Sequence, residues 1–134
     1  MTEPSAIGVP SYSQSLPREG ESAKSARALV SDALTVWGLE EIEDAAWLVI
    51  SELVSNSVKH ARMETIRVTV SRVGPARVRV QVTDRSHELP VQRHAEDTDV
   101  CGRGLAIVAA MSENWGVTAL RWGKRVWADL EIKP

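Results

Sequence analysis

The strongest constraint in this sequence is a pair of short stretches in which valine and isoleucine alternate strictly with polar residues. The first stretch is Ile66–Val70, the second is Val78–Val82, and Gly74-Pro75 lies between them. A period of two places the aliphatic side chains of each stretch on one face of a strand, and a glycine-proline pair favours a turn. The sequence therefore predicts an antiparallel hairpin with one buried face.

Two segments before this hairpin have helical periodicity instead. Over Ala26–Trp37 the apolar residues recur at spacings of three and four, which is typical of an amphipathic helix, and Gly38 is a suitable helix stop. A second helix is expected over Glu41–Ala61, because acidic residues open it and its apolar residues cover about half of the circumference. Trp37 and Trp47 occupy core positions in these patterns.

The remaining segments complete the order of elements. Thr83–Cys101 is polar and aperiodic, and Gly104–Met111 has a short helical pattern. Val117–Trp122 and Val126–Ile132 are predicted to form a second hairpin that turns at Gly123-Lys124. This order favours an α+β fold, a two-layer sandwich in which helices cover one face of a mainly antiparallel sheet.

A chain of 134 residues is suited to one domain. Residues 1–20 hold three of the six prolines and several serines, so we expect a flexible lead-in, with Ser11–Leu16 as a candidate edge strand. Residues 21–134 are then a single folded domain.

Composition excludes several classes of protein. No apolar run approaches the roughly 20 residues of a membrane span, and Met1–Gly20 lacks the basic and apolar blocks of a signal peptide. A lone Cys101 cannot form an internal disulfide, so we expect a cytoplasmic protein.

The formal charge of −2 also argues against a dedicated nucleic-acid binder. Four arginines fall in the first hairpin, and we interpret them as a solvated sheet face. They are Arg67, Arg72, Arg77 and Arg79.

Three segments carry candidate chemistry. Glu52 and Asn56 lie one helical turn apart, and a carboxylate can deprotonate a hydroxyl while an amide oxygen suits Mg²⁺. Asp84 ends a strand, where its oxygens can accept a hydrogen bond from an exocyclic amine such as that of adenine. Gly102–Leu105 opens a helix, where backbone amides favour phosphate. Taken singly, such patterns are more often a solvated helix flank and an ordinary helix cap, and an aspartate at a strand end commonly starts a turn.

Their order and spacing are more specific. Glu-Leu-Val-Ser-Asn-Ser-Val-Lys-His-Ala, a hairpin ending in Val-Thr-Asp, Gly-Arg-Gly-Leu-Ala-Ile-Val, Trp-Gly-Val and Gly-Lys-Arg-Val-Trp follow one another over Ser22–Ile132. This series resembles the GHKL (Bergerat) ATP-binding fold. More narrowly, it resembles the bacterial anti-sigma factor serine/threonine kinases.

The resemblance implies a role for each matching residue. Glu52 is then the general base, Asn56 the residue that holds Mg²⁺ against the ATP phosphates, and Asp84 the residue that recognises adenine. Ser86–Cys101 is the ATP lid. The other cofactor-binding positions that the resemblance implies are Lys59, His60, Ala61, Ser86, Gly102, Arg103, Gly104 and Leu105.

The resemblance further implies a kinase that phosphorylates an anti-anti-sigma protein, sequesters a sigma factor and pairs as a homodimer. Two departures leave an alternative open. The residues after Asp84 contain no glycine where the family's first glycine box usually has two, and Arg125 replaces a small or hydroxyl residue. The alternative is a nucleotide-binding protein that acts only through protein–protein binding.

Overall fold

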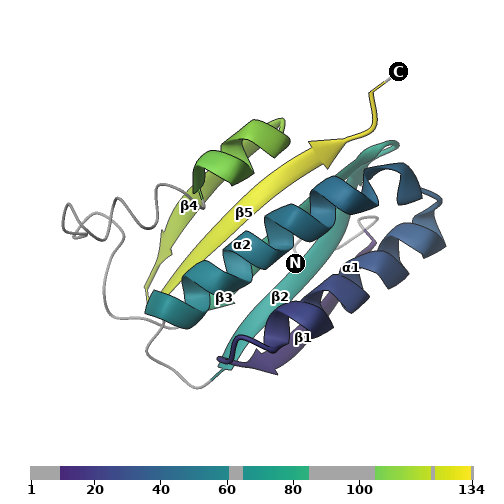
Figure 1. Ribbon diagram of the computed structural model, residues 1–134. Coiled ribbons are helices and arrows are strands. Elements are labelled where there is room, and N and C mark those ends of the chain that lie inside the picture. Colours follow the sequence, from purple (N-terminus) through teal and green to yellow (C-terminus); the bar gives the residue numbers. More distant parts are fainter. Residues whose placement is uncertain (1–9, 61–64, 85–104, 122, 134) are drawn as a thin grey trace.

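A computed structural model of the chain describes residues 10–60, 65–84, 105–121 and 123–133 (Figure 1). Within these ranges, residues 105–111 form a helix, and a 3₁₀ turn, η2 (Glu40–Ile42), precedes the longest helix. The other elements are β1 (Ser11–Pro17), α1 (Ser22–Trp37), α2 (Glu43–His60), β2 (Thr65–Gly74), β3 (Arg77–Asp84), β4 (Asn114–Leu120) and β5 (Gly123–Glu131).

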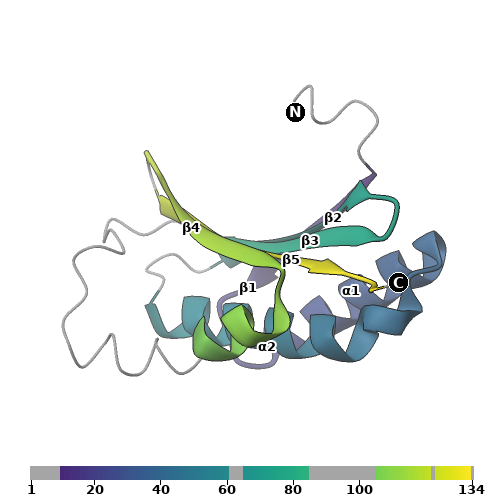
Figure 2. The same cartoon turned by 90° about the horizontal axis from the view of Figure 1, so that it is seen from above.

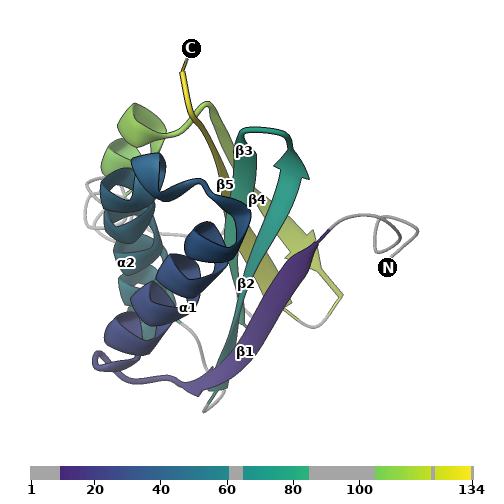
Figure 3. The ribbon, with the colours of Figure 1, turned by 90° about the vertical axis from the view of Figure 1, so that its right-hand side faces the viewer.

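In the described part of the chain the strands form one sheet in the order β1-β2-β3-β5-β4, and every neighbouring pair is antiparallel. Figures 2 and 3 show α1, α2 and the 105–111 helix together on one face of this sheet. The predicted α+β sandwich is therefore confirmed. The candidate strand Ser11–Leu16 lies within β1, which pairs with β2 along its whole length at the sheet edge.

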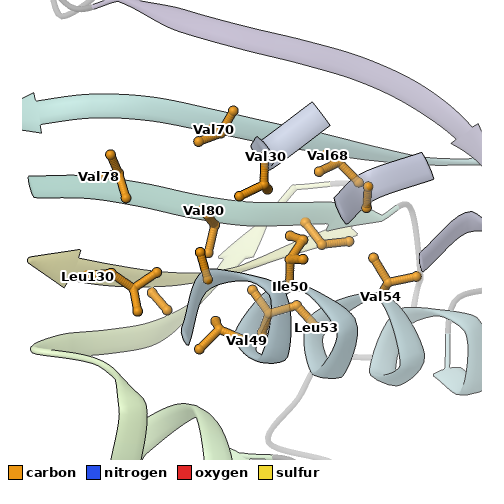
Figure 4. Close-up of a cluster of buried hydrophobic side chains, with 14 of the residues drawn as sticks. Val30, Val49, Ile50, Leu53, Val54, Val68, Val70, Val78, Val80 and Leu130 are labelled. Atoms are coloured by element: carbon orange, nitrogen blue, oxygen red, sulfur yellow. The ribbon is translucent and has the colours of Figure 1, made fainter. Parts of the chain in front are cut away.

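The core between the two layers is aliphatic. The alternate residues of β2 and β3 point toward the helices, and Val68 and Val80 are fully buried against Ile50 and Leu53 of α2 (Figure 4). Burying each such side chain stabilises the fold by about 1.5–3 kcal/mol. The alternation that predicted the first hairpin is thus the pattern that builds the core.

The ends of the helices follow local chemistry. Gly38 has a φ of 71°, a conformation that favours glycine, and the N–H of Leu39 donates to the carbonyl of Leu34 at 2.9 Å. The predicted helix stop is confirmed. The second helix begins at Glu43 rather than Glu41, because the chain first makes the 3₁₀ turn.

Two expectations need correction. β4 ends at Leu120, which pairs with Gly123, so Gly123 and Lys124 belong to β5 and are not the turn. Trp47 is 40% exposed and donates from Nε1 to Ser31 Oγ of α1 at 2.6 Å, so it lies on the outer surface and not in the core. Its indole nitrogen needs a polar partner, which the rim between the helices provides.

Candidate functional site

Asp84 is the last residue of β3, and it points toward the helices. The strand alternates between buried and half-buried positions, and Asp84 continues the buried series of Val80 and Val82 with only 1% of its surface exposed. Ser57 Oγ donates a hydrogen bond to Asp84 Oδ2 at 3.0 Å. A carboxylate at this depth is costly unless it is hydrogen-bonded, so the contact orients Asp84 at the end of the aliphatic core.

Ser57 reaches this position because it lies on the apolar stripe of α2. It follows Ile50, Leu53 and Val54 at spacings of seven, four and three, and it is 1% exposed. Ser57 is not among the site residues predicted from the sequence. The available signal was a small hydroxyl residue in phase with an aliphatic stripe.

Lys124 is the second residue that the sequence analysis missed. It is the direct cross-strand partner of Asp84 on β5 and is 2% exposed. Lys124 is in phase with Val126 and Ala128, both of which face the helices. Gly123-Lys124 was predicted to be a turn, so Lys124 was not counted with Val126 and Ala128 as part of an alternating strand pattern. We call Asp84, Ser57 and Lys124 the Asp84 cluster.

Glu52 and Asn56 lie together on one flank of α2, and both are partly exposed. The opposite flank contacts α1, because Ser51 accepts a hydrogen bond from Arg27 at 3.2 Å and Trp47 donates to α1. At 100° per residue, Glu52 and Asn56 therefore face away from α1. The 105–111 helix lies on that side of α2 (Figures 1 and 3).

The last turn of α2 is anchored from outside the helix. Arg18 Nη1 donates to the carbonyl of Val58 at 3.0 Å. The last carbonyls of a helix have no partner within it, so a cation there is favourable. This contact holds the turn that carries Asn56 and Ser57.

The other predicted site residues divide into two groups. Lys59 is exposed at the end of α2, His60 is the last residue of that helix, and Leu105 is partly buried against the core at the start of the 105–111 helix. The rest lie outside the described residues, namely Ala61, Ser86, Gly102, Arg103 and Gly104.

Three of the four arginines of the first hairpin lie on the open face of the sheet, namely Arg67, Arg77 and Arg79. Arg79 donates to Asp129 at 2.7 and 3.0 Å, and Arg77 donates to Asp129 and Glu131 at 3.3 and 3.2 Å. The hydrogen bond with Asp129 raises the pKa of Arg79. Arg67 donates to the Ser15 hydroxyl at 3.1 Å.

Arg72 donates to the Pro75 carbonyl at 2.7 Å. Arg72 is in phase with Val68 and Val70 and is opposite Val78, so it projects to the helix-covered side of the sheet. The interpretation as a solvated sheet face therefore applies to Arg67, Arg77 and Arg79, and is wrong for Arg72.

The described residues fit ATP with Mg²⁺ in their chemistry. Asp84 offers acceptor oxygens for an exocyclic amine. Asn56 offers the amide oxygen that a hard cation accepts, and Mg²⁺ usually takes few protein ligands beside phosphate and water. Glu52 is a partly exposed carboxylate one turn from Asn56. The three groups lie on α2 and at the end of the strand that α2 packs against.

None of the helices in the described ranges has the length and apolar content needed to cross a membrane. A comparison with curated proteins gave no match. A family model described as histidine kinase-, DNA gyrase B-, and HSP90-like ATPase matches residues 41–134. This match covers well over half of the chain, includes α2, β3 and β5, and confirms the GHKL part of the resemblance. The chain therefore belongs to the family of histidine kinase-, DNA gyrase B-, and HSP90-like ATPases.

Proposed function

We propose that this protein is an ATP-dependent serine/threonine kinase that phosphorylates an anti-anti-sigma protein and sequesters a sigma factor. Family membership implies ATP binding and ATP-dependent activity. The observation that carries the proposal is the position of Glu52 and Asn56 on the helix whose Ser57 holds Asp84. One rigid element thus connects the reactive carboxylate with the base-recognising carboxylate.

Glu52 is the residue assigned to proton transfer. It accepts the proton of the acceptor hydroxyl while that oxygen bonds to the γ-phosphorus of ATP, and the bond from phosphorus to the β,γ-bridging oxygen breaks to release ADP. Such a base contributes about 10²- to 10⁴-fold to a rate. Its partial exposure leaves it accessible to a protein substrate.

Asn56 and Asp84 are assigned to positioning. Asn56 holds Mg²⁺ through its amide oxygen, and the ion neutralises phosphate charge when bound. Asp84 accepts a hydrogen bond from the adenine amine and so fixes the base end of the nucleotide. Phosphoryl transfer depends mostly on such positioning and charge neutralisation.

A second candidate function is binding without transfer. Asp84 is followed by Arg85, Ser86, His87 and Glu88, so the glycines of the first box are absent. In that case ATP or ADP is a regulatory ligand, and the protein acts through its partners alone.

Replacing Glu52 by Gln separates the two functions. The purified protein is mixed with labelled ATP, Mg²⁺ and its cognate partner, and the phosphoprotein is quantified. We expect transfer to fall by at least about 100-fold in E52Q with ATP affinity unchanged. Glu43→Gln, at the start of the same helix, is the matched control and retains transfer.

Two results would each overturn a part of this proposal. The first is ATP binding by the wild type without any phosphoprotein, which supports the second candidate function. The second is equal transfer by wild type and E52Q, which removes Glu52 from the reaction. Sedimentation of the protein alone and with its sigma factor tests the homodimer and the sigma factor complex that the resemblance implies.

A further inference from the structure

Lys124 is one of the most buried side chains among the described residues, although lysine is rarely buried without a partner. It is directly opposite Asp84 in the β3–β5 ladder. Opposite residues of an antiparallel pair project to the same face, with Cβ atoms about 4.5–5.5 Å apart. The most buried cation of the β5 strand is thus placed beside the carboxylate proposed to recognise the base.

The depth of both residues restricts what they can do. A buried ammonium group is costly unless it is paired and hydrogen-bonded, and a buried carboxylate has the same requirement. The register places the two residues where each can satisfy part of the requirement of the other. Ser57 already donates to Oδ2 of Asp84. An ammonium group can only donate hydrogen bonds, and a carboxylate can only accept them.

We propose that Lys124 is a second base-recognition residue and that it determines specificity for a base with an amine beside a ring nitrogen. The amine donates to Asp84, while the adjacent ring nitrogen accepts from the Lys124 ammonium group. Adenine has this pattern at its exocyclic amine and N1. Guanine has the reverse pattern at the corresponding positions, a carbonyl beside an N–H, and so presents an acceptor to the carboxylate there.

This inference rests on the proposed function, because it needs ATP to bind with its base at Asp84. Cytosine has an amine beside a ring nitrogen as well, so CTP is included in the test to separate base size from hydrogen-bond pattern. A purely structural Lys124, which only pairs with Asp84, is the outcome to be excluded.

The test removes the donor from the protein and the acceptor from the ligand, separately and together. Calorimetry compares ATP with 1-deaza-ATP, in which a C–H replaces N1, on wild type and Lys124→Met with Mg²⁺ present. We expect wild type to bind 1-deaza-ATP at least about tenfold more weakly, since hydrogen bonds to charged groups are the stronger ones. In K124M the two ligands should bind within twofold of each other.

Lys133→Met is the matched control. Lys133 is exposed near the C-terminal end of the described chain, where it forms an ion pair with Glu113, so K133M should keep the wild-type ratio. GTP should bind wild type more weakly than ATP, and CTP should be weaker than ATP but stronger than GTP. Circular dichroism checks that each variant folds, and equal binding of the two ligands by wild type overturns the inference even where K124M does not fold.

Three results would overturn the inference. Equal binding of ATP and 1-deaza-ATP by wild type removes the hydrogen bond to N1. If the ratio of the two affinities in K124M is the same as in wild type, Lys124 does not donate to N1. Lys124 is then only a structural partner of Asp84. No binding of ATP by wild type at all overturns the proposed function itself, and this result differs from the other two because there is then no ratio to measure.

Discussion

Asp84 and Asp129 are both buried aspartates of the same sheet, but they lie on opposite faces of it. Asp129 is on the open face, where Arg79 contacts both of its oxygens and Arg77 contacts one. The Arg79 guanidinium also lies 4.3 Å from the centre of the Trp127 ring. Asp84 is on the helix-covered face, where a hydroxyl of α2 donates to it.

The difference shows that burial alone does not mark a functional carboxylate. Asp129 is 3% exposed and Asp84 is 1% exposed, yet the first is surrounded by charged groups of its own sheet and has a structural role. Asp84 lies at a strand end, beside the helix that carries Glu52 and Asn56. The partners and the position, rather than the depth, distinguish the two.

The sharpest test of this comparison is the same substitution at both positions. We expect Asp84→Asn to weaken ATP binding by about 10- to 100-fold, because a hydrogen bond to a charged group is worth about 1.5–3 kcal/mol. Asp129→Asn should leave the ATP affinity within twofold of wild type. Calorimetry with Mg²⁺-ATP measures both affinities. A similar loss of ATP affinity in the two variants would show that Asp84 and Asp129 do not differ in their role in ATP binding.

The second test measures the stability of the fold instead of the affinity for ATP. Asp129→Asn should lower the free energy of unfolding by about 2 kcal/mol, because it removes a bidentate charge-assisted pair whose arginines are only partly exposed. Urea denaturation measures this value. Combining it with Arg79→Met should cost less than the sum of the two single losses.

The pH dependence of that stabilisation follows from Arg79. Its hydrogen bond with Asp129 raises its pKa, which is already far above neutrality. A raised pKa contributes stability that is complete below the unfolded value and is lost only as pH rises through the folded value. The Arg79 contribution should therefore stay constant through the neutral range and fall only in strong alkali.

The fold could be predicted largely from the sequence because its signals are periodic. The alternation around Gly74 specified the first hairpin, and the left-handed Gly38 ended α1 as expected. The turn of the second hairpin was predicted at the wrong residues. Gly123 and Lys124 are residue types that favour a turn, but in the structure both pair with β4 as part of a strand. Trp47 was placed in the core because its spacing fits the apolar stripe, whereas its indole N–H favours the rim.

The candidate site was only partly predictable. Glu52, Asn56 and Asp84 were selected because their side chains have recognisable chemistry at a recognisable spacing. Ser57 and Lys124 were missed because each depends on a register between elements far apart in the sequence. A single sequence specifies which face a residue lies on, but not which residue of another strand or helix it meets there.

A further prediction concerns the packing of the open face. A Cβ atom at Gly116 would lie 2.8 Å from Cζ2 of Trp127, so Gly116→Ala forces the ring that contacts the Arg79 guanidinium to shift. We expect a loss of about 1–2 kcal/mol in the free energy of unfolding, as for other overpacked sites, with no change in ATP affinity. Gly20→Ala is the control, since nothing lies within 4 Å of its Cβ position.

The smallest expected effect is at Ser57, whose hydroxyl orients Asp84 on the helix-covered face of the sheet. Ser57→Ala removes one neutral donor at 3.0 Å from the carboxylate, so ATP affinity should fall by about three- to tenfold, corresponding to about 1 kcal/mol. Ser51→Ala, on the flank of the same helix that faces α1, should leave the affinity unchanged. If S57A and S51A bind Mg²⁺-ATP equally, the hydroxyl does not orient Asp84 for the base, and the contact has the same structural role as the arginine contacts of Asp129.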